Sequence, residues 1–413
     1  MNAFHARVKA SFAPDHHDRD FHLFLVVGVL AGFAGGIYNT VFNNFLNDAY
    51  QLSSTARGVV EFPRELPGML IFIVLALLSF LGDVRLSALG MLAAALGALG
   101  LGILSPTFAL MLVWMMMFSL GTHITMPLTP SIGMALSKPD EYGARLSRYS
   151  AYSLSATIVS FAVVWVGFRY LAMTYTTAFL LVAVFYVAAA FMLTVMKPNR
   201  PEKTKVRLFL HRRYTLYYFL SIVNGARKQI FLTFAPWVLI QVFHLDPPVF
   251  AILGVVVAFI SIVTRRIVGR AIDVLGERIV LSAEAVFLVV LCMGYAFSEK
   301  LFPASIALIV IAVCFILDNA TSSVDMARST YVRRIAPDAS EVTPTLSAGL
   351  SLDHVVSMTI PIAGGLLWAA AGYQAVFMAA AVIGVLNFTL SMFMKSKAQL
   401  ASLHEVESDP GLS

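Results

Sequence analysis

Cysteine and charge are both scarce in this chain of 413 residues. There are two cysteines, Cys292 and Cys314, and each lies inside an apolar stretch. This placement argues against a disulfide framework or a cysteine metal cluster, so we expect both thiols to serve in packing. Charged residues make up 13% of the chain, against about 25% in soluble proteins. So little charge excludes an ordinary soluble domain and indicates an integral membrane protein.

Motifs for catalysis and for nucleotide binding are also missing. The sequence has no H-E-x-x-H, no Ser/His pairing and no phosphate-cradling loop in or beside its apolar stretches, so an enzyme is not expected. Because there is no Walker motif, the chain has no ATP-hydrolysing site of its own. We expect neither a cofactor nor a metal. A signalling or scaffold protein is a further alternative, which would show neither transport nor stabilisation by a substrate.

Apolar sequence is what the chain has in abundance. Hydrophobic residues make up 59% of it, with a mean hydropathy of +0.81, and runs of about 20 apolar residues recur, each long enough to cross a membrane as a helix. Runs such as residues 69–80 are apolar on every side, which excludes the alternating strands of a barrel. The predicted fold is therefore an all-α membrane protein with twelve transmembrane helices. Their predicted ranges are residues 21–48, 57–80, 86–104, 107–134, 147–168, 173–196, 214–241, 248–268, 279–297, 303–327, 344–370 and 373–394.

Basic residues are sorted by side of the membrane. Residues 1–20 are polar and the first apolar run is long enough to span, so no cleavable signal sequence is evident and the amino terminus should stay inside. With that orientation only Arg57, Arg169 and Lys300, of 29 Lys and Arg, lie in external segments, as the positive-inside rule requires. We expect a bacterial inner (plasma) membrane protein with both termini cytoplasmic. The net charge of +6 then reflects orientation and not nucleic-acid binding.

A basic stretch at residues 197–213 divides the chain into two halves. A connector of this composition beside a membrane is expected to contact lipid head groups. The predicted organisation is a cytoplasmic tail, a six-helix half, the basic linker, a second six-helix half and a cytoplasmic tail, in a protein expected to be a monomer. These parts are residues 1–20, 21–196, 197–213, 214–394 and 395–413.

The two halves repeat each other. Residues 21–52 align with residues 214–245 at a constant offset, and further along Asp83 aligns with Asp273. Parallel repeats of six helices joined by a basic linker are an established transporter plan. The sequence therefore predicts two pseudo-symmetric six-helix halves.

The segment GRAIDVLGER, from Gly269 to Arg278, carries a family resemblance. It is similar to the motif G-x-x-x-D-(R)-x-G-(R/K)-(R/K) between the eighth and ninth helices of the major facilitator superfamily (MFS), which the chain resembles over its whole length without matching a particular subfamily. The resemblance implies conformational gating by this loop. Gly269 would allow close helix approach, Asp273 would accept hydrogen bonds, and Arg270 and Arg278 would be charge partners.

Other segments vary in how well they match that superfamily. Residues 349–377 resemble its eleventh-helix pattern, including Pro361 and Gly364. The first-half copy of the loop motif keeps Asp83 as a gating candidate, but Ser79 stands where the first glycine is expected and the later basic pair is missing. The fifth helix lacks the glycine-rich motif of many drug exporters, which disfavours drug/proton antiport.

Two adjacent cations, Arg227 and Lys228, interrupt the apolar seventh helix. Charged residues at membrane depth are costly and almost always face a bundle interior or a watery cavity. We expect at least one of them to bind an anionic group of a substrate, with Gln229 orienting it. The alternative is an ion pair with an acid such as Asp318 or Asp353.

Polar residues of the first two helices are further candidates. Tyr38, Asn39 and Asn43 are suited to hydrogen bonding with a polar substrate, or else to contacts between helices. Glu61 and Glu65 are four residues apart, with Arg64 between them, so one helical turn gathers two acids and a base. This cluster would hold a proton or a cation, or form a self-neutralised external gate.

Proton coupling is expected from acids and histidines of later helices. Asp318 and Asp353 fall deepest among the acids and are candidates to carry a proton through the transport cycle. His123 and His354 are candidate shuttles because of their intrinsic pKa, although an interior histidine is more often simply hydrogen-bonded. Asp325 and Arg328, three residues apart, are expected to form a local ion pair.

These features predict a secondary active transporter. It would move a small polar solute, anionic or zwitterionic, by alternating access of two halves, coupled to protons or another ion. The alternative is proton-coupled efflux of a cationic or amphiphilic compound, with Glu61, Glu65 and Asp318 as acceptors.

Overall fold

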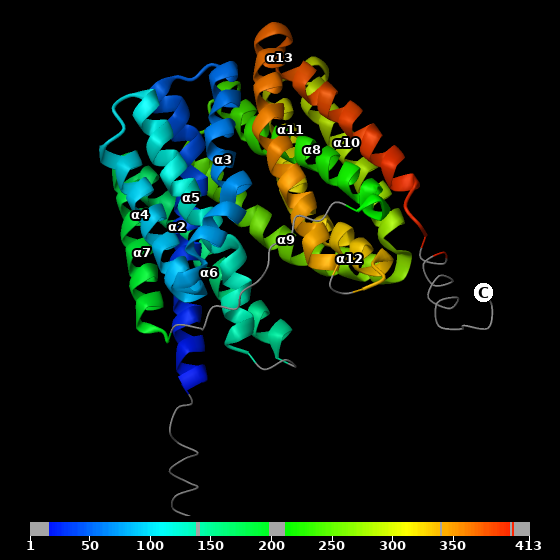
Figure 1. The fold of residues 1–413 in the computed structure, drawn as a ribbon. Helices are drawn as coiled ribbons and strands as arrows, with labels where there is room; N and C mark the ends of the chain where they lie inside the picture. Colours follow the sequence, from blue (N-terminus) through cyan, green and yellow to red (C-terminus); the bar gives the residue numbers. More distant parts are fainter. Residues whose placement is uncertain (1–15, 138–140, 198–210, 339–340, 397–398, 400–413) are drawn as a thin grey trace, which may run out of the picture. The chain divides into compact units, whose positions relative to one another are not determined.

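The computed structural model describes residues 16–137, 141–197, 211–338, 341–396 and 399. In this part of the chain nearly every residue is helical and no strand occurs, which confirms the predicted all-α class (Figure 1). Most of the predicted basic linker and of both predicted tails lies outside the described residues.

The helices lie close to the predicted ranges. In chain order they are α2 (His16–Tyr50), α3 (Ser54–Leu78), α4 (Asp83–Ile103), α5 (Phe108–Ala135), α6 (Tyr142–Tyr170), α7 (Tyr175–Val195), α8 (Thr215–Gln241), α9 (Pro247–Leu275), α10 (Glu277–Leu301), α11 (Ala304–Thr321), α12 (Asp325–Ile335) and α13 (Val342–Met392). Short 3₁₀ helices lie at Ser79–Leu81, Arg212–Tyr214 and Ser322–Val324.

Ten helical stretches of the described chain are long and apolar enough to cross a membrane. The helix α8 is not among them, because its polar residues lower its hydropathy, although its 27 residues are long enough. One of the ten, α13, runs over 51 residues and contains a kink at Gly372, where φ is 82°. Counting α8 and dividing α13 at its kink is consistent with the twelve predicted spans, and the protein is an integral membrane protein.

Local sequence sets where several helices begin. The Thr107 hydroxyl accepts a hydrogen bond from the amide of Leu110 and so caps α5. Thr174 and Thr177 form a reciprocal capping box at the start of α7, and the Asp246 carboxylate caps α9. These side chains bind amide groups that have no partner inside the helix.

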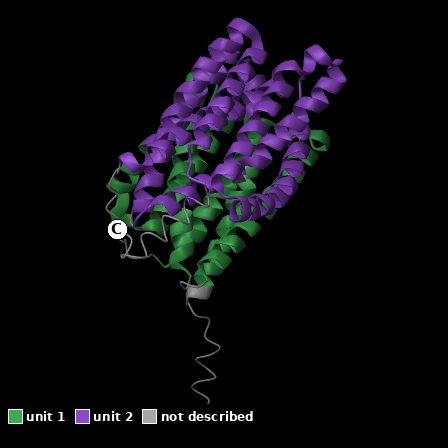
Figure 2. Cartoon of the chain, turned by 90° about the vertical axis from the view of Figure 1, so that its right-hand side faces the viewer, with its two compact units in different colours: residues 1–42, 70–204 green, residues 43–69, 205–413 purple. Residues whose placement is uncertain are grey.

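Contacts divide the chain into two units, coloured separately in Figure 2. Unit 1 comprises residues 1–42 and 70–204, and unit 2 comprises residues 43–69 and 205–413. Unit 2 therefore contains the end of α2 and most of α3 together with α8 to α13. Because most of the basic linker is not described, the predicted division there stays a prediction.

Small residues allow close packing within each unit. In unit 1, α4 packs against α5 and α7. A side chain at Gly97 or Gly121 would collide with the main chain of the facing helix. In unit 2, α13 packs against α8 and α10, and a side chain at Gly225 would lie 2.7 Å from the Asp353 carboxylate. Glycine at these positions is what membrane helices use for close approach.

The internal repeat differs in register from the predicted pairing of Asp83 with Asp273. Gly82 and Gly276 have nearly the same positive-φ conformation, and each immediately precedes a helix. Asp83, the first residue of α4, therefore corresponds to Glu277, the first residue of α10. Since the helix starts define the register, the sequence pairing was shifted by four residues.

Candidate solute-binding cavity

Arg227 and Lys228 leave α8 in different directions, as the 100° between successive helical residues requires. The Arg227 guanidinium is buried and lies 3.0 Å from Asp318 of α11 and 3.9 Å from Glu284 of α10. It also donates a hydrogen bond to the side-chain oxygen of Asn224 at 3.4 Å. Arg227 is thus a buried cation held by acids of two other helices.

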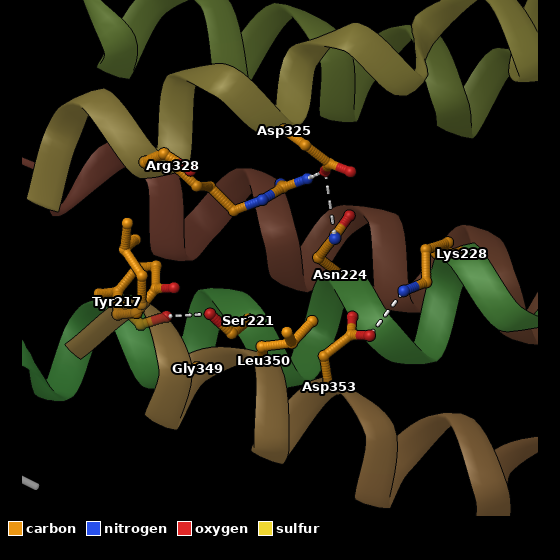
Figure 3. A pocket seen from close by; sticks show the side chains of 11 residues that line it. Tyr217, Ser221, Asn224, Lys228, Asp325, Arg328, Gly349, Leu350 and Asp353 are labelled. Atoms are coloured by element: carbon orange, nitrogen blue, oxygen red, sulfur yellow. Dashed lines mark hydrogen bonds and ion pairs between the residues drawn. The ribbon is translucent and has the colours of Figure 1, made fainter. Parts of the chain in front are cut away.

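Lys228 lies at the edge of a cavity in unit 2. Its ammonium group is 2.5 Å from the Asp353 carboxylate of α13, and its side chain is 33% exposed. The cavity has a volume of about 260 Å³, and both residues line it (Figure 3). Lys228, and not Arg227, therefore lines this cavity. The full lining consists of Tyr217, Ser221, Asn224, Lys228, Asp325, Arg328, Ser329, Leu346, Gly349, Leu350 and Asp353.

A break in the tenth span forms the opposite wall. The helix α11 ends at Thr321, a 3₁₀ turn follows, and α12 begins at Asp325. Asp325 is therefore a first-turn residue, a position where the helix dipole favours a carboxylate. It contacts the Arg328 guanidinium, which confirms the predicted local ion pair, and accepts a hydrogen bond from the Asn224 amide at 3.4 Å. Figure 3 shows these groups converging from α8 and α12.

The charges lining the cavity balance. Lys228 and Arg328 contribute two positive charges, and Asp325 and Asp353 contribute two negative charges. Each cation contacts one of the two carboxylates. The cavity is therefore polar and formally neutral, with both signs of charge available to a solute.

Glu61 is the centre of an ionic cluster on α3. It is fully buried and receives Arg57 at 2.5 Å, Arg64 at 2.6 Å and the side-chain amide of Gln229 at 2.8 Å. The guanidinium of Arg57 also donates to Asn43 at 3.0 Å. Gln229 and Asn43 are thus bound to other side chains and do not line the cavity, so their predicted contact with a solute is not supported by this geometry.

Glu65 extends this cluster to α13. Its carboxylate lies 3.3 Å from Arg64 and 3.1 Å from Nδ1 of His354. We call Arg57, Glu61, Arg64, Glu65, Gln229 and His354 the α3 clamp, because they join α3 to α8 and α13 within unit 2. Since His354 follows Asp353 in the chain, the clamp and the cavity share adjacent residues. The proton-coupling roles expected of Glu61, Glu65 and His354 stay predictions.

Three candidates of the first half, Tyr38, Asn39 and His123, lie in unit 1. The Tyr38 ring is buried and stacks on Phe118 with centroids 3.8 Å apart, and its expected contact with a solute stays a prediction. Asn39 is exposed. His123 of α5 has its Nδ1 2.9 Å from the main-chain oxygen of Ser119, so it bonds one turn back on its own helix.

The motif from Gly269 to Arg278 differs from the expectation in two ways. A side chain at Gly269 would meet no described atom within 4 Å, so this structure does not support the predicted close helix approach there. The buried acid is Glu277, 2.8 Å from Arg334 of α12, whereas Asp273 and Arg270 are exposed and Arg278 is half-buried. In unit 1 the Ser131 hydroxyl donates to Asp83 at the corresponding helix start.

Sequence reasoning missed three charged residues of unit 2. Glu284 is an acid inside the span predicted at residues 279–297. Because charged residues at membrane depth almost always face a bundle interior, the argument used for Arg227 and Lys228 also predicts an interior position for Glu284. Arg57 was assigned to an external segment because it begins an apolar run, but it is fully buried. Glu277 could have been found from its position directly after Gly276, where a helix begins. It was missed because the sequence alignment paired Asp83 with Asp273 instead.

Comparisons with known proteins agree with this architecture. Residues 217–410 match the family model of the Major Facilitator Superfamily. The nucleoside transporter NupG has 11% identity and a TM-score of 0.73, over 91% of this chain and 98% of that one. A D-xylose–proton symporter has 14% identity and a TM-score of 0.69, over 92% and 98%. A bacterial homologue of the human lysosomal transporter Spinster has 14% identity and a TM-score of 0.68, over 91% and 96%.

No curated protein sequence matches the chain, and the structural likenesses at these low identities establish the fold alone. The family match covers the second half, while the fold is shared over about nine-tenths of the length. The second half of the chain is therefore similar in sequence to the Major Facilitator Superfamily, and about nine-tenths of the chain shares its fold with solved membrane transporters, with no subfamily identified.

Proposed function

We propose that the protein is a secondary active transporter for a small anionic or zwitterionic solute, coupled to protons, that works by alternating access. The solute binds in the cavity of unit 2, between Lys228 of α8 and Arg328 of α12. With the orientation that the basic residues predict, this cavity lies in the cytoplasmic half of the membrane, and both termini are cytoplasmic in a bacterial inner membrane.

The balanced charge of the cavity is the observation that carries this proposal. Net charge in a low-dielectric site is costly, so a neutral lining takes up an anion most readily with a compensating positive charge. A zwitterion brings that charge as its own ammonium group. A simple anion obtains it when Asp353 takes up a proton, which also releases Lys228 from its ion pair.

The proteins with a similar fold support the reaction class. One of them is a symporter of D-xylose and protons and another is a nucleoside transporter, so this fold carries small polar solutes and uses proton coupling. Cation export is less well supported, because none of the acceptors expected for it, Glu61, Glu65 and Asp318, is among the residues that line this cavity.

Proteoliposomes with an internal pH indicator provide the test. Purified protein is assayed with monocarboxylates, dicarboxylates, α-amino acids and phosphate esters, and with a quaternary ammonium compound for the export alternative. We expect an anionic or zwitterionic class to move together with protons. In Asp353→Asn, solute movement of a simple anion should no longer change the internal pH. Transport of the quaternary ammonium compound alone would contradict the proposal.

A further inference from the structure

We propose that Arg328 is the anchor for the anionic group of the solute, and that Asp325 occupies this anchor as a tethered carboxylate which the solute displaces. The inference depends on the proposed function and names the side chain that recognises the solute. It assigns to the Asp325 and Arg328 pair a role in binding, beyond that of a local ion pair.

Arg328 lies between two carboxylates of unequal mobility. Its side chain is 6% exposed; Glu284, 3.8 Å away on α10, is 3% exposed. Asp325, on the other side, is 55% exposed and lines the cavity. Glu284 is fixed by packing and cannot leave without exposing a buried charge. Asp325 can turn into the cavity without exposing a buried charge, because 55% of its side chain is already exposed, and the anionic group of the solute then replaces it as the partner of Arg328.

The position of the Asp325 carboxylate is suited to a carboxylate from a solute. The Arg328 guanidinium and the side-chain amide of Asn224 both contact it. The Nη1 atom of Arg328 is buried and faces Glu284 at 3.8 Å, whereas the Nη2 atom contacts Asp325. A guanidinium binds carboxylates and phosphates through charge-assisted hydrogen bonds, so displacement of Asp325 leaves the Nη2 donor to a solute oxygen.

The second charged pair lies one helical turn away. Asn224 and Lys228 are four residues apart on α8, which places Lys228 about 6 Å along the helix. A solute bound to Arg328 therefore reaches the Lys228 and Asp353 pair with a second polar group. This second group is an ammonium near Asp353 in a zwitterion, or a further oxygen near Lys228 in a dianion.

Binding of succinate, L-glutamate and inorganic phosphate to the purified full-length protein provides the test. Thermal shifts give apparent dissociation constants, with mannitol as the uncharged control solute. Asp325→Asn keeps a partner for Asn224 but removes the competing charge. Because a short tether gives a local concentration in the millimolar range or above, we expect this variant to bind at least one of these anions about tenfold more tightly than the wild type. Arg328→Lys, which lacks the planar fork, should bind the same anion about tenfold more weakly.

A cysteine variant provides an independent test in case Asp325→Asn misfolds. The chain has only two cysteines, and both are buried, so the new thiol of Asp325→Cys is the reactive one. Labelling it with an anionic methanethiosulfonate restores a tethered charge and should weaken anion binding about tenfold relative to a neutral label of similar size. Equal affinity with both labels would overturn the inference.

The outcomes also separate this inference from the proposed function. In one outcome, the wild type transports an anion that Asp325→Asn binds no more tightly than the wild type does. That result would contradict the proposal that the solute displaces Asp325, but not the proposal that the protein transports anions. If no carboxylate or phosphate binds to the wild type or to Asp325→Asn, and none is transported, both proposals fail.

Discussion

The Lys228 ammonium group lies 2.5 Å from the Asp353 carboxylate at the edge of the cavity, with a third of the lysine side chain exposed. Its neighbour Arg227 is buried against Asp318 and Glu284 and does not line that cavity. Two adjacent cations therefore have different surroundings. Under the proposed function, Lys228 exchanges its acid for a solute, whereas Arg227 stabilises the helix bundle.

Replacement of the exposed cation should impair binding more than folding. A hydrogen bond to a charged group contributes about 1.5–3 kcal/mol, so Lys228→Ala should raise the half-saturating solute concentration roughly ten- to a hundredfold. Uptake into proteoliposomes measures this change. Lys300→Ala, at an exposed position near the end of α10, is the matched control and should transport like the wild type. Equal kinetics of the two variants would exclude Lys228 from the solute site.

Replacement of the buried cation should act on stability first. Arg227→Ala leaves Asp318 and Glu284 buried with one cation fewer, and breaking a buried ion pair costs about 3–5 kcal/mol. The apparent Tm of the purified protein should fall clearly, whereas Arg270→Ala, at an exposed arginine, should change the free energy of unfolding by no more than about 0.5 kcal/mol. Unchanged stability with lost transport would instead restore Arg227 to the binding role that the sequence suggested.

The helices could be predicted from sequence because a membrane helix forms all its backbone hydrogen bonds within its own segment. Its position along the chain therefore does not depend on neighbouring helices. The start of α4 was placed at residue 86 and lies at Asp83. The candidate site could be predicted only as a set of polar residues. Arg227 and Lys228 were marked correctly as interior, but which of them faces water depends on the acids of α10, α11 and α13.

Side-chain contacts between different helices were the feature that sequence predicted least well. Gln229 looked like a solute ligand because it follows two cations, yet it donates to Glu61, which is 168 positions away in the sequence. Gly269 looked like a packing glycine because it starts a motif, whereas its surroundings are open. Such differences arise because helix rotation is set by tertiary packing, and the local sequence does not record it.

The α3 clamp should be sensitive to loss of its central acid. Glu61→Gln leaves Arg57 and Arg64 facing a neutral group, and we expect a cost of about 3–5 kcal/mol because Glu61 is fully buried. Amide hydrogen exchange along α3 should become faster. Glu141→Gln breaks the surface pair with Arg145, which should cost no more than about 1 kcal/mol. Similar exchange in the two variants would show that the clamp does not hold α3.

Gly225 should be needed for the contact between Lys228 and Asp353. A side chain there would lie 2.7 Å from the Asp353 carboxylate and 3.1 Å from its Cα, so α13 or the carboxylate must move. Alanine favours a helix over glycine by about 1 kcal/mol, so Gly225→Ala should not unfold α8 itself. We expect it to reduce transport about tenfold through a displaced Asp353, as measured in proteoliposomes.

Gly269→Ala is the matched control for this substitution, because it adds the same methyl group where no described atom lies within 4 Å. It should transport like the wild type, although the sequence motif had marked Gly269 as the glycine that needs close packing. If Gly269→Ala abolished transport and Gly225→Ala did not, the motif would matter through a conformation in which Gly269 is packed. The close approach of α8 and α13 would then not be what positions Asp353.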